Sequence, residues 1–172
     1  FNPVQSAHAL AFAEASDAPV TALNDSFAEL AGRTDLPDFD VIALHGIWTW
    51  ISEENSRHIV DIIRRKLRVG GIVYISYNCF PGWAPAAPLR HLMKLHGDLA
   101  GAEAAGISAK VDAALAFAKQ VVDSGAQYFR GNPAVGERLK KITELSRNYL
   151  AHEYFNKDWR ITAFSDMAAT LD

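Results

Sequence analysis

Three short segments of this sequence combine aromatic and polar side chains, and each follows a stretch patterned as a β-strand. They are Asn24-Asp25-Ser26-Phe27, His45-Gly46-Ile47-Trp48-Thr49-Trp50 and Tyr77-Asn78-Cys79-Phe80-Pro81-Gly82-Trp83. Ligands of open α/β sheets bind beyond the carboxyl ends of the strands, where these segments would lie. Aromatic rings beside polar groups suit a flat heterocycle next to a polar reactant. The alternative is that the tryptophans only anchor loops on the core, but three such strand ends favour a ligand site.

Metal chemistry fits the sequence poorly. His91 and His96 are five positions apart and therefore do not share one face of a helix. His152-Glu153 lacks the second histidine of a zinc-protease motif. The single cysteine, Cys79, excludes a disulfide within the chain and a cysteine-based zinc site. We therefore expect no metal in the site.

A strand–helix–strand pattern should position these segments. Phe39–Leu44 is apolar without alternation, which predicts a strand covered on both faces of a parallel sheet. Ser52 is a helix cap, and Gly70-Gly71 ends the helical pattern before a second strand, Ile72–Tyr77. The expected buried stripe of this helix is Ile59, Val60, Ile63 and Leu67. Short loops around such a helix predict that the two strands are parallel neighbours in an α/β fold.

Weaker signals mark other elements. Asn2 before Pro3 predicts the start of a helix, and Val20–Leu23 is patterned as a short strand. A brief helix is expected from Phe27 to Ala31, and a late strand from Arg160 to Phe164. Between residues 88 and 156 the pattern is helical, with breaks near glycines. Its stripes are Val111, Leu115, Ala118 and Val122, then Leu139, Ile142, Leu145 and Tyr149.

Composition narrows the function classes. A formal net charge of −3 argues against nucleic acid as a partner, because phosphate binding needs a basic face. Arg64, Arg65, Lys66 and Arg68 gather near a helix end, where complementing the helix dipole is the favoured interpretation. No apolar run reaches the roughly 18–20 residues of a membrane span, and no signal peptide is visible. A single cysteine suits a reducing compartment, so a cytoplasmic location is expected.

Three motifs carry a resemblance to a known family. The segments from His45 to Ser52, from Tyr77-Asn78 to Pro81-Gly82-Trp83, and from Leu150 to Tyr154 resemble bacterial class I S-adenosylmethionine-dependent methyltransferases. More narrowly, they resemble those carrying a methyltransferase regulatory domain, some of whose relatives methylate protein lysines. The resemblance implies a Rossmann-like parallel sheet within residues 1–87. It also implies a helical insertion or cap with the start of the regulatory domain in residues 88–172.

The family's glycine-rich turn and the acidic residue that holds the ribose should lie upstream of Phe1. We therefore expect an N-terminally truncated sheet, and a chain that folds but by itself binds the cofactor weakly and is inactive. For cofactor binding the resemblance implies Asp25 beside the adenine amino group. The other implied cofactor residues are Phe1, Asn2, Ser26, Phe27, His45, Gly46 and Ile47. As an alternative, Asp25 is the cap of the short helix that follows it, and His45 is structural.

The resemblance also implies residues on the acceptor side. Tyr77, Asn78 and Tyr154 would line the channel of the methyl acceptor and orient its nitrogen, and Trp48, Trp50 and Trp83 would complete that channel. The resemblance implies a protein side-chain amine as the acceptor. The absence of an Asn-Pro-Pro-aromatic run argues separately against nucleobase amines.

Two other functions stay open: a catalytically silent binding module, and another Rossmann enzyme such as a nicotinamide dehydrogenase. The residues before Phe1 would discriminate between them. Whether the protein forms a homo-oligomer is also left open.

Overall fold

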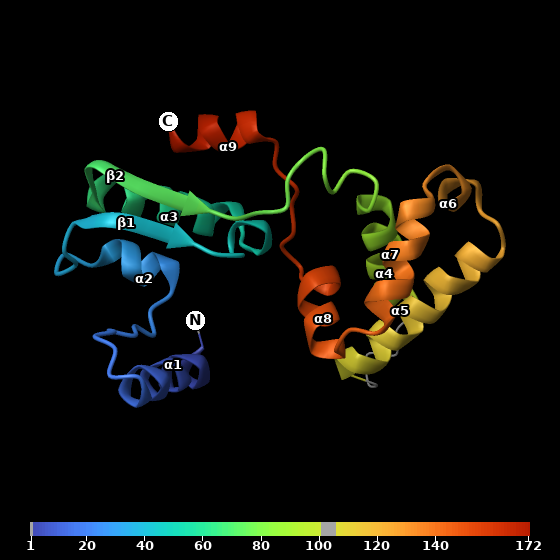
Figure 1. Cartoon of the computed structure of the whole chain (residues 1–172), viewed down its shortest axis with the longest axis horizontal. Coiled ribbons are helices and arrows are strands. Elements are labelled where there is room, and N and C mark those ends of the chain that lie inside the picture. Colours follow the sequence, from blue (N-terminus) through green and yellow to red (C-terminus); the bar gives the residue numbers. More distant parts are fainter. Residues whose placement is uncertain (1, 101–105) are drawn as a thin grey trace. The chain divides into compact units, whose positions relative to one another are not determined.

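The chain divides into two compact units, each described here by itself. The computed structural model describes residues 2–100 and 106–172. The first unit, called the strand unit, runs to Ser76 and also takes in Leu171; the second, called the helical unit, comprises Tyr77–Thr170 and Asp172. Figure 1 shows their elements along the chain.

Two parallel strands form the sheet of the strand unit. β1 (Phe39–Leu44) pairs with β2 (Leu67–Ile75), with Val41 opposite Ile72 and Leu44 opposite Ile75. Helix α3 (Glu53–Lys66) connects them (Figure 1). The predicted parallel neighbours and the α/β fold are confirmed. β2 starts earlier than expected. Between the pairs Phe39–Leu67 and Val41–Ile72 the register is irregular, and the extra residues of β2 there include Gly70, with φ of +84°.

Helix α3 follows from local signals. The Ser52 side chain accepts a hydrogen bond from the Asn55 N–H over 3.2 Å and caps the first turn, which carries two glutamates. Arg65 pairs with Asp61 at 2.7 Å. The helix buries Ile59, Val60, Ile62 and Ile63. The basic cluster lies at its end, as expected, and Lys66 also donates to the Leu36 carbonyl over 2.6 Å.

The prediction that both faces of the sheet are covered is wrong. Val41 is 57% exposed, Ile72 64% and Tyr74 49%, all on one face of the strands. Side chains alternate between the two faces of a strand, so Leu44 points to the opposite face from Val41. Leu44 is 5% exposed. The sheet therefore buries only one face within this chain, and an apolar face is left in contact with solvent.

Helices α1 (Pro3–Ala15) and α2 (Phe27–Gly32) form where expected, and Asn2 caps α1. The predicted strand at Val20–Leu23 does not form. A strand needs a neighbouring ladder, and the only sheet in the described residues joins β1 to β2. The predicted strand Arg160–Phe164 is reduced to a single bridge between Thr162 and Cys79, because helix α9 (Phe164–Leu171) begins directly afterwards.

The helical unit confirms the helical pattern of residues 88–156, apart from 101–105, which lie outside the described residues. Its helices are α4 (Ala87–Ala100), α5 (Gly106–Asp123), α6 (Gln127–Gly131), α7 (Pro133–Thr143) and α8 (Arg147–Phe155). Their core includes Leu89, Met93, Val111, Ala114, Leu115, Ala118, Leu139, Ile142 and Leu150. No helix in the described residues is long and apolar enough to cross a membrane.

The second predicted apolar stripe is confirmed for two of its four residues and wrong for the other two. Leu139 and Ile142 are buried, but Leu145 is 41% exposed and Tyr149 50% exposed. The cause is a helix break: α7 ends at Thr143, and Ser146 caps a new helix by accepting from the Tyr149 N–H. The helical period cannot continue through this turn, so the later residues leave the core face.

Candidate functional site

A glycine turn ties together the carboxyl ends of β1 and β2. Gly46 has φ of +63°, and its N–H donates to the Ser76 side-chain oxygen over 2.7 Å. The Ser76 N–H in turn donates to the Leu44 carbonyl over 3.0 Å. Since L residues rarely adopt positive φ, this turn requires glycine at position 46. The conformation brings bare backbone to the end of the sheet, where the resemblance implies a cofactor contact.

Gly46→Ala should lower the free energy of unfolding by about 1–2 kcal/mol, the cost of a left-handed backbone for an L residue. A side-chain carbon at Gly46 would meet only Trp50 Cζ3 at 3.7 Å, so the loss is conformational rather than steric. Urea unfolding measures this loss of free energy of unfolding. Gly32→Ala is the matched control: that glycine has negative φ and open space around its Cβ position, so no loss is expected. Equal effects for both variants would contradict the argument.

The other residues after β1 divide into exposed and buried groups. His45 is exposed and stacks on Tyr74, with ring centroids 6.1 Å apart. Ile47 and Trp50 are half-buried, whereas Trp48 is 1% exposed. The residues Trp48–Trp50 form a short 3₁₀ helix. The indole of Trp48 therefore belongs to the packed interior of the turn, and His45 presents its ring to solvent.

Asp25 does not cap helix α2. Ser26 is the cap: its hydroxyl accepts from the Glu29 N–H over 3.2 Å, and the Glu29 carboxylate accepts from the Ser26 N–H over 2.7 Å. Asp25 instead accepts from Arg33 Nη1 at 2.9 Å, and Arg33 also pairs with Asp35 at 2.6 Å. Hydrogen bonding to Arg33 lowers the pKa of Asp35. The alternative interpretation of Asp25 as a helix cap is therefore wrong, and its carboxylate is oriented by Arg33.

The remaining predicted cofactor residues lie in different places. Asn2 is exposed and caps α1 through its side-chain oxygen, Phe27 is half-buried at the start of α2, and Phe1 lies outside the described residues. An apolar cavity of about 240 Å³ also opens in the strand unit. It is lined by Leu23, Leu30, Leu36, Phe39, Val41, Ile42 and Ile62. Sequence reasoning did not identify this cavity, because its lining residues come from segments that are separated along the chain.

The helical unit gathers three of the predicted acceptor-side residues: Asn78, Trp83 and Tyr154. Asn78 Nδ2 donates to Glu153 Oε1 over 3.3 Å. Tyr154 is 1% exposed, and its ring centroid lies 6.2 Å from that of Trp83. Tyr77 precedes Asn78 and is half-buried. The segment after β2 and the end of α8, which are distant in sequence, thus meet in one cluster.

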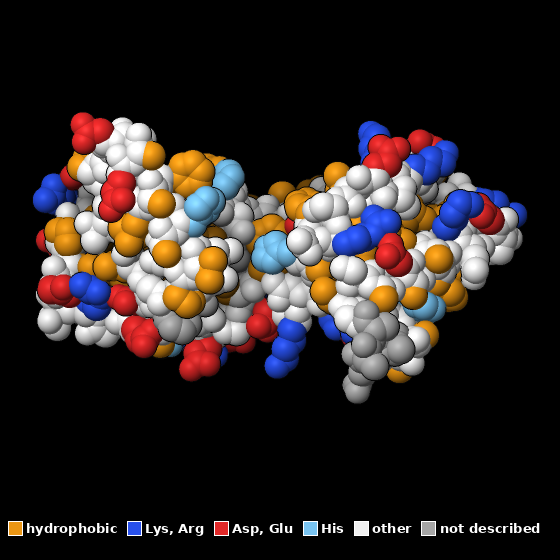
Figure 2. Space-filling view, turned by 90° about the horizontal axis from the view of Figure 1, so that it is seen from below, with side chains coloured by type: hydrophobic (Ala, Val, Ile, Leu, Met, Phe, Trp, Pro, Cys, Tyr) orange, Lys and Arg blue, Asp and Glu red, His pale blue; other side chains and the backbone are white. Residues whose placement is uncertain are grey.

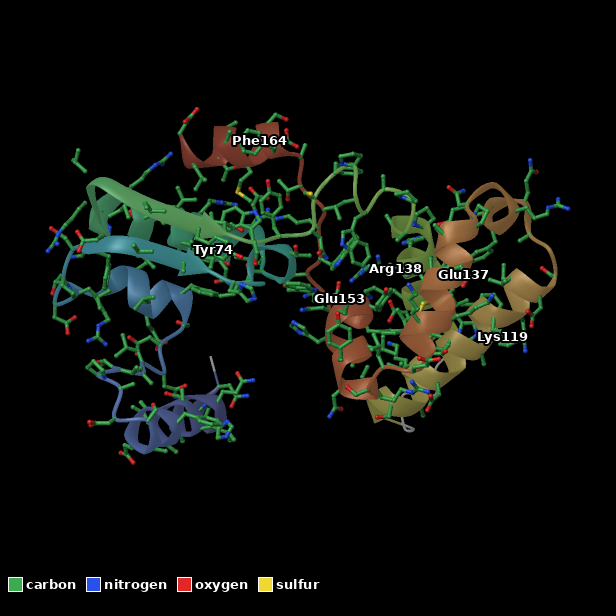
Figure 3. The ribbon with its side chains drawn as sticks, viewed as in Figure 1. Tyr74, Lys119, Glu137, Arg138, Glu153 and Phe164 are labelled. Carbon is green, nitrogen blue, oxygen red and sulfur yellow. The ribbon has the colours of Figure 1, made fainter. Side chains whose placement is uncertain are left out.

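Two arginines complete this cluster. The Arg138 guanidinium lies 3.9 Å from the Trp83 ring centroid, and its Nε donates to the Tyr154 hydroxyl over 3.0 Å. The Arg90 guanidinium lies 4.1 Å from the Trp159 ring centroid. Trp83 and Trp159 meet edge to face at 5.5 Å. We call these residues, with Asn78 and Glu153, the arginine–tryptophan cluster; Figure 3 labels Arg138 on α7 and Glu153 on α8.

Burial shifts the pKa values of the ionisable groups in the cluster. It lowers the pKa of Arg90 to about 10 and raises the pKa of Glu153, where the Asn78 hydrogen bond and the nearby arginines act in the opposite direction. Burial also raises the pKa of Tyr154, so this phenol stays protonated at neutral pH. Sequence reasoning missed Arg90, Arg138 and Trp159, because no local motif connects them to the strand end.

The described residues contain no group of three His, Cys, Asp or Glu side chains that could hold a metal ion. On the face shown in Figure 2, acidic and basic side chains are interspersed rather than gathered into one basic patch. The chemistry available to these residues is therefore hydrogen bonding, aromatic contact and charge placement, which orient a ligand.

Relatives of this chain are bacterial proteins of greater length. No family model matches the sequence. It is 44% identical over 173 residues to the uncharacterized protein sll1526 of Synechocystis, covering all of this chain and 33% of that protein. It is 26% identical over 119 residues to an uncharacterized protein of Rickettsia prowazekii, covering 69% of this chain and 46% of the relative. The chain thus spans a third to a half of the length of these relatives.

Solved structures define the class of fold. The chain superimposes on PKMT2 from Rickettsia typhi in complex with AdoHcy, with a TM-score of 0.71 and 22% identity over 99% of this chain and 31% of that one. A second structure of PKMT2 from the same organism gives a TM-score of 0.66. The protein therefore has a Rossmann-like α/β fold of the methyltransferase type, followed by a mainly helical segment.

Proposed function

We propose that this chain is part of an S-adenosylmethionine-dependent methyltransferase. The observation that carries the proposal is the fold similarity to PKMT2 solved with AdoHcy, which extends over 99% of this chain. AdoHcy is S-adenosylmethionine after loss of its methyl group, so a site that holds one accommodates the other. The same similarity favours S-adenosylmethionine as the cofactor here.

The cofactor would lie at the carboxyl ends of the strands of the strand unit. Asp25, held by Arg33 at 2.9 Å, is the proposed acceptor for the adenine amino group, because a carboxylate oxygen accepts from an exocyclic amine. The backbone at Ser26 and Phe27 would contact the ring. The turn at Gly46, with His45 and Ile47, would lie against the methionine part, where the missing side chain lets the backbone approach. Asn2 would flank the adenosine.

Methyl transfer from a sulfonium is an in-line displacement, so the protein contributes alignment and a shaped site. In the helical unit we assign the acceptor channel to Tyr77, Asn78 and Tyr154, with Trp83 beside them. Trp48 and Trp50 of the strand unit are assigned to the acceptor side as well. An amine acceptor must arrive in its neutral form, although free lysine titrates near 10.4. The amide of Asn78 is well suited to orienting such a nitrogen, because Glu153 fixes one end of it.

For the whole protein, we propose a protein side-chain amine as the methyl acceptor. Membership of the bacterial group with a methyltransferase regulatory domain, with that domain beginning in residues 88–172, is part of the same proposal. So is a cytoplasmic location, which the single cysteine supports.

Titration of S-adenosylmethionine into the full-length protein tests this function. Asp25→Ala should weaken binding by about 1–3 kcal/mol, the range for a lost buried hydrogen-bond partner. Asp35→Ala is the matched control, since it removes the other carboxylate bound to Arg33 but leaves Asp25 in place. Unchanged affinity in Asp25→Ala would contradict the adenine assignment. Failure of the unmodified protein to bind would favour the silent binding module instead.

A further inference from the structure

Arg138 is held in one orientation by two independent contacts. Its guanidinium carbon lies 3.9 Å from the Trp83 ring centroid, and its Nε donates to Tyr154 over 3.0 Å. Tyr154 is 1% exposed, so its hydroxyl is itself fixed by packing. A planar guanidinium that is held by one face and by Nε keeps the direction of its two terminal nitrogens.

Those terminal nitrogens meet no acceptor in the part of the chain that the structure describes. Arg138 makes no ion pair there, although two carboxylates lie close in sequence or space. Glu137 pairs with Lys140 at 2.7 Å, and Glu153 accepts from Asn78. Arg138 is half-buried, so its end is neither sealed inside the core nor freely moving in solvent. Two parallel N–H groups in this position match the two oxygens of a carboxylate.

The charge of the surroundings favours a monoanion. The arginine–tryptophan cluster contains two guanidinium groups, Arg90 and Arg138, and one carboxylate, Glu153. Arg90 is 7% exposed, and its Nε is buried without a hydrogen-bond partner among the described residues. One more negative charge would balance the cluster, since a charge removed from water is stabilised by an opposite charge nearby. A carboxylate supplies that charge, whereas a phosphate dianion would exceed it.

We propose that Arg138 is a binding site for a carboxylate group, contacted through its two terminal nitrogens. Under the proposed function, on which this assignment rests, the carboxylate is that of an acidic residue of a protein acceptor. The chemistry is bidentate recognition of a planar monoanion by a guanidinium whose orientation is fixed in advance. Binding of a free carboxylate does not require methyl transfer, so the site can be tested even if the proposed function fails.

The first experiment titrates acetate into the full-length protein labelled with 5-fluorotryptophan, at constant ionic strength set with chloride. The Trp83 resonance, assigned with Trp83→Phe, should shift in a saturable way. Arg138→Lys keeps the charge but loses the planar fork, and should weaken acetate binding about tenfold. Lys141→Gln, an exposed position on the same helix, removes one charge and should leave binding unchanged.

Several outcomes would overturn the proposal. They are the absence of a saturable shift, equal binding in Arg138→Lys, an equal loss in Lys141→Gln, or tighter binding of inorganic phosphate than of acetate. Thermal unfolding of each variant shows that the fold is retained, and a second variant, Arg138→Gln, must lose acetate binding as well.

A second experiment tests the acceptor as the source. AdoHcy carries a carboxylate, whereas 5′-methylthioadenosine lacks it. Arg138→Gln should leave the affinity for both nucleosides unchanged, because neither carries the acceptor's carboxylate. A loss of AdoHcy affinity alone would contradict the acceptor as the source, and an equal loss for both nucleosides would count against the site.

Discussion

Leu150→Ala should lower the free energy of unfolding of the helical unit by about 2–5 kcal/mol, the range for truncating a fully buried leucine. Leu150 is 0% exposed and belongs to the core cluster that includes Met93 and Val111. Its removal leaves a cavity that α4, α5 and α8 can only partly close. Hydrogen exchange measured by mass spectrometry should show lost protection in these helices.

The matched variant for the strand unit is Ile59→Ala, at a position on α3 that is 4% exposed. It should reduce protection in α2, α3 and β2, because α3 packs against α2 and β2 in that unit. If either variant reduced protection equally throughout the described residues, the chain would unfold as one cooperative body. The division at Ser76 would then have no energetic meaning.

The sequence predicts the elements whose signals are local. The bounds of β1, the Ser52 cap and the pair Asp61–Arg65 follow from residues within a few positions of one another. The parallel pairing of β1 and β2 also follows, since a short connection through one helix permits little else. These features are confirmed because neighbouring residues decide them.

Predictions that depend on tertiary neighbours were less successful. Val20–Leu23 has the composition of a strand but no adjacent ladder, and the exposed face of Val41, Ile72 and Tyr74 has the composition of a buried one. Apolar composition shows that a strand can be buried. Whether it is buried depends on the segments that pack against it. The stripe at Leu145 and Tyr149 is wrong for another reason: α7 ends at Thr143 and Ser146 caps a new helix, so helical periodicity does not continue between them.

The candidate site was predictable only in part. The strand-end segments identified Asn78 and Trp83 as candidate site residues. Glu153 lies 75 positions from Asn78, and although it belongs to the Leu150–Tyr154 motif, nothing in the sequence assigned it to the site. Arg138 showed no signal at all, since an arginine on an amphipathic helix is ordinarily a solvated residue. Its role depends on Trp83 and Tyr154 packing against it, and a single sequence does not contain that contact.

Glu153 should make stability fall as pH rises. Burial raises the pKa of Glu153 in the folded state above its ordinary value of 4.5. Between these two pKa values the folded protein binds more protons than the unfolded chain does. The free energy of unfolding therefore decreases with pH in that window, by about 1.4 kcal/mol for each unit that separates the values. Below the ordinary pKa the group is protonated in both states and contributes no such loss.

Glu153→Gln tests this sign, because it keeps an oxygen acceptor for Asn78 and removes the ionisation. Urea unfolding from pH 4 to pH 8 should show a variant whose stability gains on the unmodified protein as pH rises. Glu137→Gln is the opposing control: its exposed carboxylate has a pKa lowered by Lys140, so that variant should lose relative stability as pH rises. A Glu153→Gln variant that is less stable at pH 8, by a margin that disappears at pH 4, would show that attraction to Arg90 and Arg138 outweighs burial. Glu153 would then be held ionised by the two guanidinium groups, and the expected sign of the pH dependence would be wrong.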